Sequence, residues 1–313
     1  MENRKASRVA ILGATSQIAK DCIVSFSKSP AYDLILYARN VETVEHWQRE
    51  IGIEARYPVF DYARYGHEAH DCVINFIGVG DPARVVAMGA SIFDITYQYD
   101  QLVLQQLETH PERRYIFLSS GAVYGSAYLE PVRAETKAEI SINHFSSSEY
   151  YSVAKLYAEC RHRALSQYSI VDLRVFNYFS RTQDMKARFF VTDMIRSIQE
   201  NRLFETSQYN IVRDYLHPSD FFRMIESILN APPINTSYDC YTRSPSEKNV
   251  ILESMREKFG LRYVVNSSQI VLNPTGLKPH YYSLNQAAGE IGYVPLYSSM
   301  ETILIESESI LKS

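Results

Sequence analysis

Short apolar runs alternate with helix-patterned stretches through the first 180 residues, and this alternation limits the fold more than any other feature of the chain. The first run, "RVAIL" at residues 8–12, stops at Gly13, and apolar residues then recur at helical spacing in "TSQIAKDCIVSFSKS". Strands that are apolar along their whole length and separated by helices are typical of a parallel sheet buried on both faces. We therefore expect an α/β fold, with strands within residues 8–12, 33–40, 55–62, 71–80, 114–125 and 168–180.

The composition argues against polyanion binding and membrane insertion. Of the 313 residues 46% are hydrophobic, enough for a sizeable core, and the net charge of −4 comes without a block of like charges. No apolar run approaches the ~20 residues of a membrane span or forms a signal peptide. The cysteines show no CxxC pair and no nearby histidine at metal-ligand spacing. We expect a soluble, cytoplasmic protein with no nucleic-acid partner, no membrane contact and no metal; its scattered cysteines are Cys22, Cys72, Cys160 and Cys240.

The strand and helix alternation loosens near Ser180, where Pro, Ser and Tyr become more frequent. We expect residues 1–180, with about 213–235, to form a dinucleotide-binding domain. Residues 181–212 and 236–313 should then form a smaller, mixed C-terminal lobe that binds the substrate. The lobe carries no readable motif, and its aromatic side chains are interpreted as core in preference to base-stacking groups: Phe189, Phe190 and Tyr209.

The stretch "ILGATSQIA" has the layout of a phosphate-binding loop between a strand and a helix. Backbone N–H groups at the start of the helix can bind a pyrophosphate, which favours a Rossmann-type doubly wound sheet. Two of the three usual glycines are replaced, by Ser16 and Ala19; alanine suits close helix packing, and the serine hydroxyl can itself donate a hydrogen bond. The loop residues expected at the cofactor are Gly13, Thr15, Ser16, Gln17 and Ile18.

The end of the second expected strand, "LYARN", favours NADPH over NADH. An NAD site normally offers an acidic residue to the ribose hydroxyls there, whereas this chain offers Arg39 and Asn40. A guanidinium matches a 2′-phosphate and offers no acceptor to a free hydroxyl; the alternative is an ordinary surface charge. After the third strand, Asp61 and its neighbour Tyr62 are expected at the adenine, although Asp61 could instead only cap a helix.

The stretch "EYYSVAKL" offers a candidate proton donor. Residues four apart share a helical face, so Tyr151 neighbours Lys155 while Tyr150 faces elsewhere. An adjacent ammonium lowers the pKa of a phenol and makes it a usable acid near neutrality; the alternative is a surface ring stacked on a lysine stem. The fifth strand ends in "SSGAVYG", whose Ser120 and Tyr124 could contact a substrate carbonyl beside Tyr151.

The phosphate loop, "NFIG", "SSGAVYG", "YSVAK", "LRVFN" and "RDYLHPSD" follow one another as in the extended short-chain dehydrogenase/reductase family, which the chain resembles up to about residue 222. The resemblance implies that Ser120, Tyr151 and Lys155 are the catalytic triad. It also implies further contacts with the cofactor by Phe76, Ile77, Gly78, Val175 and Phe176, and with the substrate by Ser120, Gly121, Tyr124, Asn177 and Arg213, the last on a nucleotide-sugar diphosphate. The family often dimerises through the helix bearing "YSVAK", which suggests a homodimer.

The residues after the catalytic hydroxyl narrow the reaction. Related 4,6-dehydratases carry an Asp-Glu pair there, and epimerase-reductases of GDP-fucose formation carry a cysteine at the position of Ala122, whereas this chain has Gly121 and Ala122. We therefore expect NADPH-dependent reduction of a nucleoside-diphosphate 4-keto-6-deoxyhexose, as in deoxysugar synthesis for lipopolysaccharide or O-antigen. The alternatives are an NAD-dependent UDP-sugar 4-epimerase and, less favoured because the triad is intact, a non-catalytic dinucleotide-sensing protein.

Overall fold

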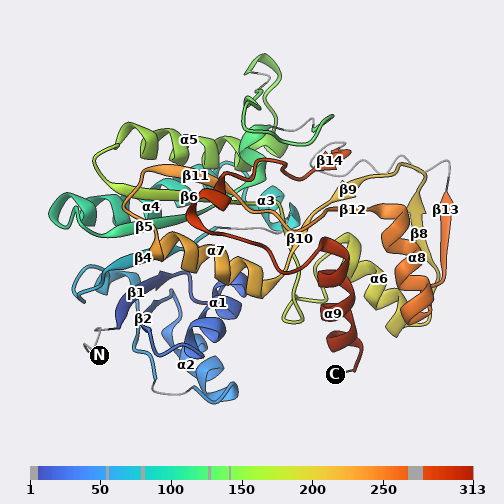
Figure 1. Cartoon of the computed structure of the whole chain (residues 1–313), viewed down its shortest axis with the longest axis horizontal. Coiled ribbons are helices and arrows are strands. Elements are labelled where there is room, and N and C mark those ends of the chain that lie inside the picture. Colours follow the sequence, from blue (N-terminus) through green and yellow to red (C-terminus); the bar gives the residue numbers. More distant parts are fainter. Residues whose placement is uncertain are drawn as a thin grey trace.

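A seven-stranded parallel sheet dominates the protein (Figure 1). The computed structural model describes residues 6–53, 56–78, 82–125, 128–140, 142–266 and 278–312. Neighbouring strands pair in parallel in the order β11-β6-β5-β4-β1-β2-β3. The expected α/β, doubly wound sheet is confirmed; its strands are β1 (Ser7–Leu12), β2 (Tyr32–Tyr37), β3 (Val59–Phe60), β4 (Cys72–Asn75), β5 (Arg114–Ser120), β6 (Ser169–Val175) and β11 (Thr236–Asp239).

Alternate residues of each strand enter two separate cores, which explains why the strands are apolar along their length. In β1, Val9 and Ile11 pack into one core, and Ala10 and Leu12 into the other. The first core is covered by α1 (Gln17–Ser27), α2 (Val41–Glu50) and α7 (Pro218–Asn230). The second is covered by α4 (Ser91–Thr109) and α5 (Tyr150–Ala164), on the opposite face in Figure 1.

A smaller lobe packs around a third core. It is built from α6 (Phe190–Gln199), β8 (Phe204–Ser207), α8 (Lys248–Phe259), β13 (Tyr263–Asn266) and α9 (Ser299–Lys312). Phe190 packs against this core, as expected, whereas Tyr209 is 45% exposed, so the core interpretation is wrong for that residue.

Short strands connect the lobe to the large sheet. β7 (Asn177–Tyr178) pairs with β10 (Tyr215–Leu216), and β9 (Val212–Arg213) pairs with both β12 (Ser246–Glu247) and β14 (His280–Tyr281). One expected boundary differs: we placed residues from 236 onward in the lobe, but β11 is the edge strand of the large sheet. Tyr293 also packs into the first core, against Tyr241. Four residues of β11 pair with β6 through the backbone, and the composition of the sequence could not predict this pairing.

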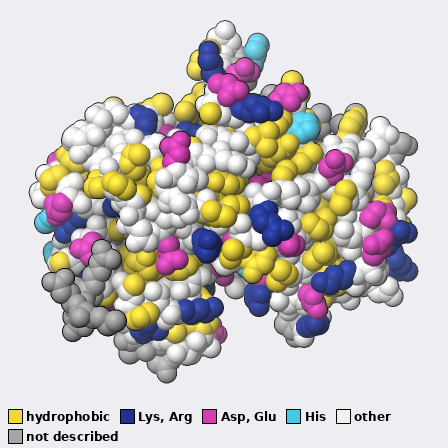
Figure 2. Space-filling model, viewed as in Figure 1, with side chains coloured by type: hydrophobic (Ala, Val, Ile, Leu, Met, Phe, Trp, Pro, Cys, Tyr) yellow, Lys and Arg dark blue, Asp and Glu magenta, His cyan; other side chains and the backbone are white. Residues whose placement is uncertain are grey.

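Charged groups are mixed on the surface and clustered inside. Figure 2 shows acidic and basic side chains interspersed on the visible face. Inside, His162 of α5 is fully buried, with Nε2 2.7 Å from Asp100 and Nδ1 2.6 Å from Asp172. Arg161 and Arg163 pair with the same two carboxylates, so the cluster fastens α5 to α4 and β6.

We predict that His162 makes folding stability depend on pH. Burial lowers the pKa of His162, but Asp172 and Asp100 outweigh burial and raise it from 6.5 to about 9. A raised pKa stabilises the fold fully below about pH 6.5, and this contribution, on the order of 3 kcal/mol, is lost as the pH rises through about 9. The measurement is urea unfolding across this range for the wild type and for His162→Gln. Their difference in the free energy of unfolding should shrink with rising pH, whereas a constant difference would mean that the folded protein holds a neutral imidazole.

Candidate active site

The carboxyl ends of β1 and β4 meet at the phosphate loop, where the strand order changes direction. Gly13 has a φ of +82°, and a Cβ there would lie 3.1 Å from backbone atoms of Phe76 and Ile77. The loop therefore needs a glycine for its conformation and for its close approach to the strand end. Ser16 begins α1 without a capping side-chain bond, Thr15 is exposed, Gln17 donates to Ser180, and Ile18 packs against the first core.

The residues expected at the adenosine lie beside this loop. Arg39 and Asn40 follow β2 and are exposed, and Asn40 caps α2 by accepting from the Thr43 amide at 3.0 Å. Asp61 caps a short 3₁₀ turn by accepting from the Arg64 amide at 3.2 Å. The cap interpretation of Asp61 is thus confirmed, while its contact with adenine remains a prediction.

Tyr62 lies near both the phosphate loop and Arg39. Its ring packs edge-on against Tyr99, with centroids 4.8 Å apart. Burial and Tyr99 raise the pKa of Tyr62 to about 12, while Arg39 and a hydrogen bond with the Gly13 backbone act in the opposite direction. The phenol therefore lies within reach of both the phosphate loop and the arginine.

Ser120 and Tyr151 meet at the carboxyl end of β5. Ser120 is 7% exposed and its Oγ accepts from the Ala122 amide at 3.1 Å. Burial raises the pKa of Tyr151, and a hydrogen bond with Ser120 opposes this rise. Tyr150 instead contacts the rings of Phe93 and Phe145, so the two tyrosines face different surroundings, as the helical spacing predicts.

Lys155 is buried behind these hydroxyls. Its Nζ donates to the Leu118 carbonyl at 2.7 Å and lies 4.2 Å from the Phe117 ring centroid. Burial lowers the pKa of Lys155 to about 8, against the opposing effects of Asp100, Asp172 and Glu159. The expectation that this ammonium lowers the pKa of Tyr151 is wrong: burial raises that pKa, and the opposing interaction is the hydrogen bond with Ser120.

Two glycines allow close packing around Lys155 and beside Ser120. A Cβ on Gly78, which follows β4, would lie 3.4 Å from Lys155 Nζ, so the backbone approaches the ammonium directly. A Cβ on Gly121 would lie 2.4 Å from the Phe176 ring, so only glycine allows that ring to pack there. Val175 ends β6 and pairs with Ser120 of β5, and Phe176 follows directly, which brings both residues to the same edge as Ser120.

The other hydroxyls of "SSGAVYG" belong to a buried polar network. Ser119 donates to Glu159 at 2.6 Å, and Arg174 holds the same carboxylate. Tyr124 donates to Asp239 at 3.1 Å and accepts from Arg174 at 2.6 Å. The substrate contact expected of Tyr124 remains a prediction, but its hydroxyl already has these partners. Of the adjacent serines, only Ser120 is left at the phenol of Tyr151.

A pair of cations borders the site on the side of the lobe. Arg213 is 8% exposed and donates to the carbonyls of Val212 and Lys278. Lys278 Nζ lies 4.9 Å from the ring centroid of Tyr281, and burial together with Arg213 lowers the Lys278 pKa to about 8. Among the described residues neither cation has a carboxylate within salt-bridge distance, which suits an anionic ligand. Asn177 donates to the carbonyl of Asp214, which follows Arg213, and to the carbonyl of Tyr281.

Sequence reasoning missed Lys278 and Tyr281. Both follow the last family motif, and the pairing of β14 with β9 brings them to Arg213, from which Lys278 is separated by 65 residues along the chain. No local sequence pattern predicts the pairing of β14 with β9, so only the fold could reveal that Lys278 and Tyr281 lie at the site. At this edge of the sheet the backbone can approach a ligand closely at Gly13 and Gly78, and Arg39 and Lys155 offer positive charge for phosphate and ribose contacts. This arrangement fits a nicotinamide dinucleotide.

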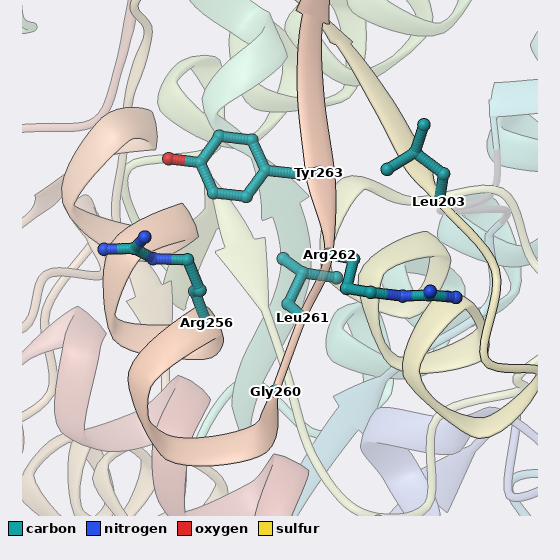
Figure 3. A pocket seen from close by; sticks show the side chains of 6 residues that line it. All are labelled: Leu203, Arg256, Gly260, Leu261, Arg262 and Tyr263. Carbon is teal, nitrogen blue, oxygen red and sulfur yellow. The ribbon is translucent and has the colours of Figure 1, made fainter.

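Other parts of the described chain offer no competing site. No three His, Cys, Asp or Glu side chains among the described residues could hold a metal ion, and no described helix is long and apolar enough to cross a membrane. A shallow pocket in the small lobe contains no expected site residue (Figure 3). Of the arginines in it, Arg256 pairs with Glu253, and Arg262 donates to the Asn201 carbonyl.

Many solved structures share this fold, and the three described below are 15–18% identical to this chain in sequence. A UDP-glucose 4-epimerase from Bifidobacterium longum, in complex with NAD+ and UDP, is 18% identical with a TM-score of 0.77, covering 98% of both chains. A UDP-glucuronic acid 4-epimerase from Bacillus cereus, with UDP-glucuronic acid and NAD, is 15% identical with a TM-score of 0.78, covering 97% of this chain and 99% of that one. A dTDP-glucose 4,6-dehydratase from Bacillus anthracis, with NAD, is 16% identical with a TM-score of 0.76, covering 98% and 97%.

The sequence itself identifies the family. A comparison with curated protein sequences gives no significant match. The model of the NAD dependent epimerase/dehydratase family, in contrast, matches residues 9–240, which include the phosphate loop, the Ser120, Tyr151 and Lys155 cluster, and the whole of the large sheet except the two residues at the start of β1. The chain is therefore a member of the NAD dependent epimerase/dehydratase family.

Proposed function

We propose that this protein is an NADPH-dependent 4-ketoreductase of a nucleoside-diphosphate 4-keto-6-deoxyhexose. The observation that carries the proposal is the hydroxyl pair of Ser120 and Tyr151 backed by the buried Lys155, with Gly121 and Ala122 following Ser120. Those two residues cannot exchange protons with a sugar ring, so the site supports hydride transfer and one proton transfer but supplies no acid and base for water elimination there.

The chemistry needs one hydride and one proton for each carbonyl. Bound NADPH supplies the hydride. Tyr151, protonated at neutral pH because burial raises its pKa, gives its proton to the carbonyl oxygen. Ser120 donates a hydrogen bond to the oxygen as negative charge develops on it, and this donor is already oriented by the Ala122 amide. Lys155 binds the nicotinamide ribose and places a positive charge near Tyr151.

The remaining expected residues divide between the two ligands. The cofactor is bound by Gly13, residues 15–18, Arg39, Asn40, Asp61, Tyr62 and residues 76–78, with Val175 and Phe176 closing the nicotinamide end. Arg213, with Lys278 beside it, binds the diphosphate of the substrate, since both cations lack a carboxylate partner in the described chain. Asn177 and Gly121 line the interval between the cations and Ser120.

The second candidate is an NAD-dependent UDP-sugar 4-epimerase. Its support is that the similar structures named above include two such epimerases with NAD, and an epimerase uses the same hydroxyls to oxidise and reduce one carbon. Arg39 argues for the reductase, because an acidic residue would suit the ribose hydroxyls of NAD better.

The function is tested by following reduced-nicotinamide absorbance with the purified protein, NADPH or NADH, and UDP-, dTDP- and GDP-linked 4-keto-6-deoxyhexoses. We expect oxidation of NADPH with one of the three nucleotides. Turnover of UDP-glucose to UDP-galactose without added cofactor, together with NAD retained through purification, would assign the epimerase instead.

We predict that Tyr151→Phe lowers kcat by on the order of 10²- to 10⁴-fold, because it removes the proton donor. NADPH affinity should stay within about twofold, since Lys155 and the loop are unchanged. Tyr150→Phe is the matched control, and its kcat should stay near that of the wild type because its ring contacts only Phe93 and Phe145 in the described structure. An exchange of the two phenotypes would contradict the assignment.

A further prediction concerns the choice of cofactor. Arg39→Ala should raise the Kd for NADPH on the order of tenfold to a hundredfold, because a charge-assisted contact with the 2′-phosphate is lost, and should leave the Kd for NADH nearly unchanged. Arg49→Ala, at the exposed far end of α2, is the control. Fluorescence titration with both cofactors provides the measurement, and equal losses for the two would remove the 2′-phosphate role of Arg39.

A further inference from the structure

Tyr281 brings a third hydroxyl to the catalytic pair, although it lies in no motif. Its Oη is 3.3 Å from Ser120 Oγ. Burial raises the pKa of Tyr281, while hydrogen bonds from Ser120 and from the Ala122 backbone act in the opposite direction. The phenol oxygen thus lies within hydrogen-bond distance of Ser120 Oγ, which itself accepts from the Ala122 amide. An oxygen placed there is in the position that a reacting carbonyl oxygen would need.

The ring of Tyr281 spans the interval between the catalytic hydroxyls and the cations. Its centroid is 4.9 Å from Lys278 Nζ and 5.9 Å from the Arg213 guanidinium carbon. In a nucleoside-diphosphate hexose the sugar joins the diphosphate directly to the reacting carbon. The hexose of such a substrate must therefore occupy the same interval as this side chain.

Both the ring and the backbone of Tyr281 have packing partners. Its ring packs against Phe176 at 5.2 Å and edge-on against Tyr128 at 4.8 Å, measured between centroids. Its backbone pairs with Arg213 in the β14 and β9 register and accepts from Asn177 at 3.4 Å. The contact with Ser120 is therefore part of a packed arrangement that joins β14 to β5, β7 and β9.

We propose that the Tyr281 hydroxyl holds the place of the substrate's reacting oxygen beside Ser120 and is displaced by that oxygen when the hexose binds. The inference rests on the proposed function. Ser120 and Tyr281 share one hydrogen bond, and Ser120 Oγ also accepts from the Ala122 amide, so the phenol oxygen and a substrate oxygen cannot both occupy this position beside Ser120. A ligand with an oxygen at the reacting carbon of its hexose replaces the phenol, whereas a nucleoside diphosphate without a hexose leaves the phenol in place. Tyr281 is thus a specificity residue that competes with the sugar.

The test compares Tyr281→Phe with the wild type by calorimetric binding in the presence of NADPH. The probes are UDP-glucose, dTDP-glucose and GDP-mannose, whose hydroxyls NADPH cannot reduce, each beside its parent UDP, dTDP or GDP. Loss of one competing hydrogen bond should tighten the binding of the recognised nucleotide sugar about three- to tenfold and leave its parent nucleotide unchanged. In turnover of the 4-keto substrate, KM should fall by a similar factor while kcat stays within about twofold.

Tyr128→Phe is the matched control. It removes a hydroxyl from the same aromatic cluster, but this hydroxyl donates to the Gly121 carbonyl and not to Ser120. It should not tighten sugar binding. Unchanged or weaker sugar binding by Tyr281→Phe, or equal tightening of the parent nucleotide, would overturn the inference while leaving the proposed function standing. Failure of the wild type to bind any of the nucleotide sugars would overturn both.

Discussion

The buried ammonium of Lys155 is the constraint on which the site depends. Removing such a charge from water costs several kcal/mol, so a buried lysine needs compensation close by. Here the Leu118 carbonyl at 2.7 Å, the face of Phe117 and the more distant carboxylates of Asp100 and Asp172 supply it. These groups come from β5, α4 and β6, so the buried lysine keeps its charge only when α5 lies against that part of the sheet. The packing that makes the fold also positions Tyr151, which lies one helical turn before Lys155.

A second buried network separates structural hydroxyls from those available for chemistry. Glu159, one turn after Lys155, accepts from Ser119 and pairs with Arg174, which in turn reaches Tyr124. Satisfying these groups inside the protein leaves Ser120 as the serine directed to Tyr151, and it anchors the turn that Gly121 begins. The tight packing of Phe176 over Gly121 explains why the residue after the catalytic serine is glycine here.

The sequence was most informative where function depends on local order along the chain. Periodicity predicted the parallel sheet, and the four-residue spacing separated Tyr151 from Tyr150. It failed where strands distant in sequence pair: β11 joins the large sheet although its residues were expected in the lobe, and β14 brings Tyr281 and Lys278 to Arg213. Tyr124 shows a different limit, because a motif gives the position of a hydroxyl but not its partners, and Asp239 lies 115 residues away.

The most direct test of the central claim is to follow the reacting hydrogen itself. The enzyme would be given NADPH carrying deuterium at both positions of C4 of its nicotinamide and the nucleoside-diphosphate 4-keto-6-deoxyhexose on which it acts, and the sugar product would be examined by NMR and mass spectrometry. A ketoreductase should place one deuterium at C4 of the sugar for each NADPH consumed. No deuterium at C4 and no NADPH consumed, together with interconversion of UDP-glucose and UDP-galactose by the same enzyme, would contradict the account and identify an epimerase.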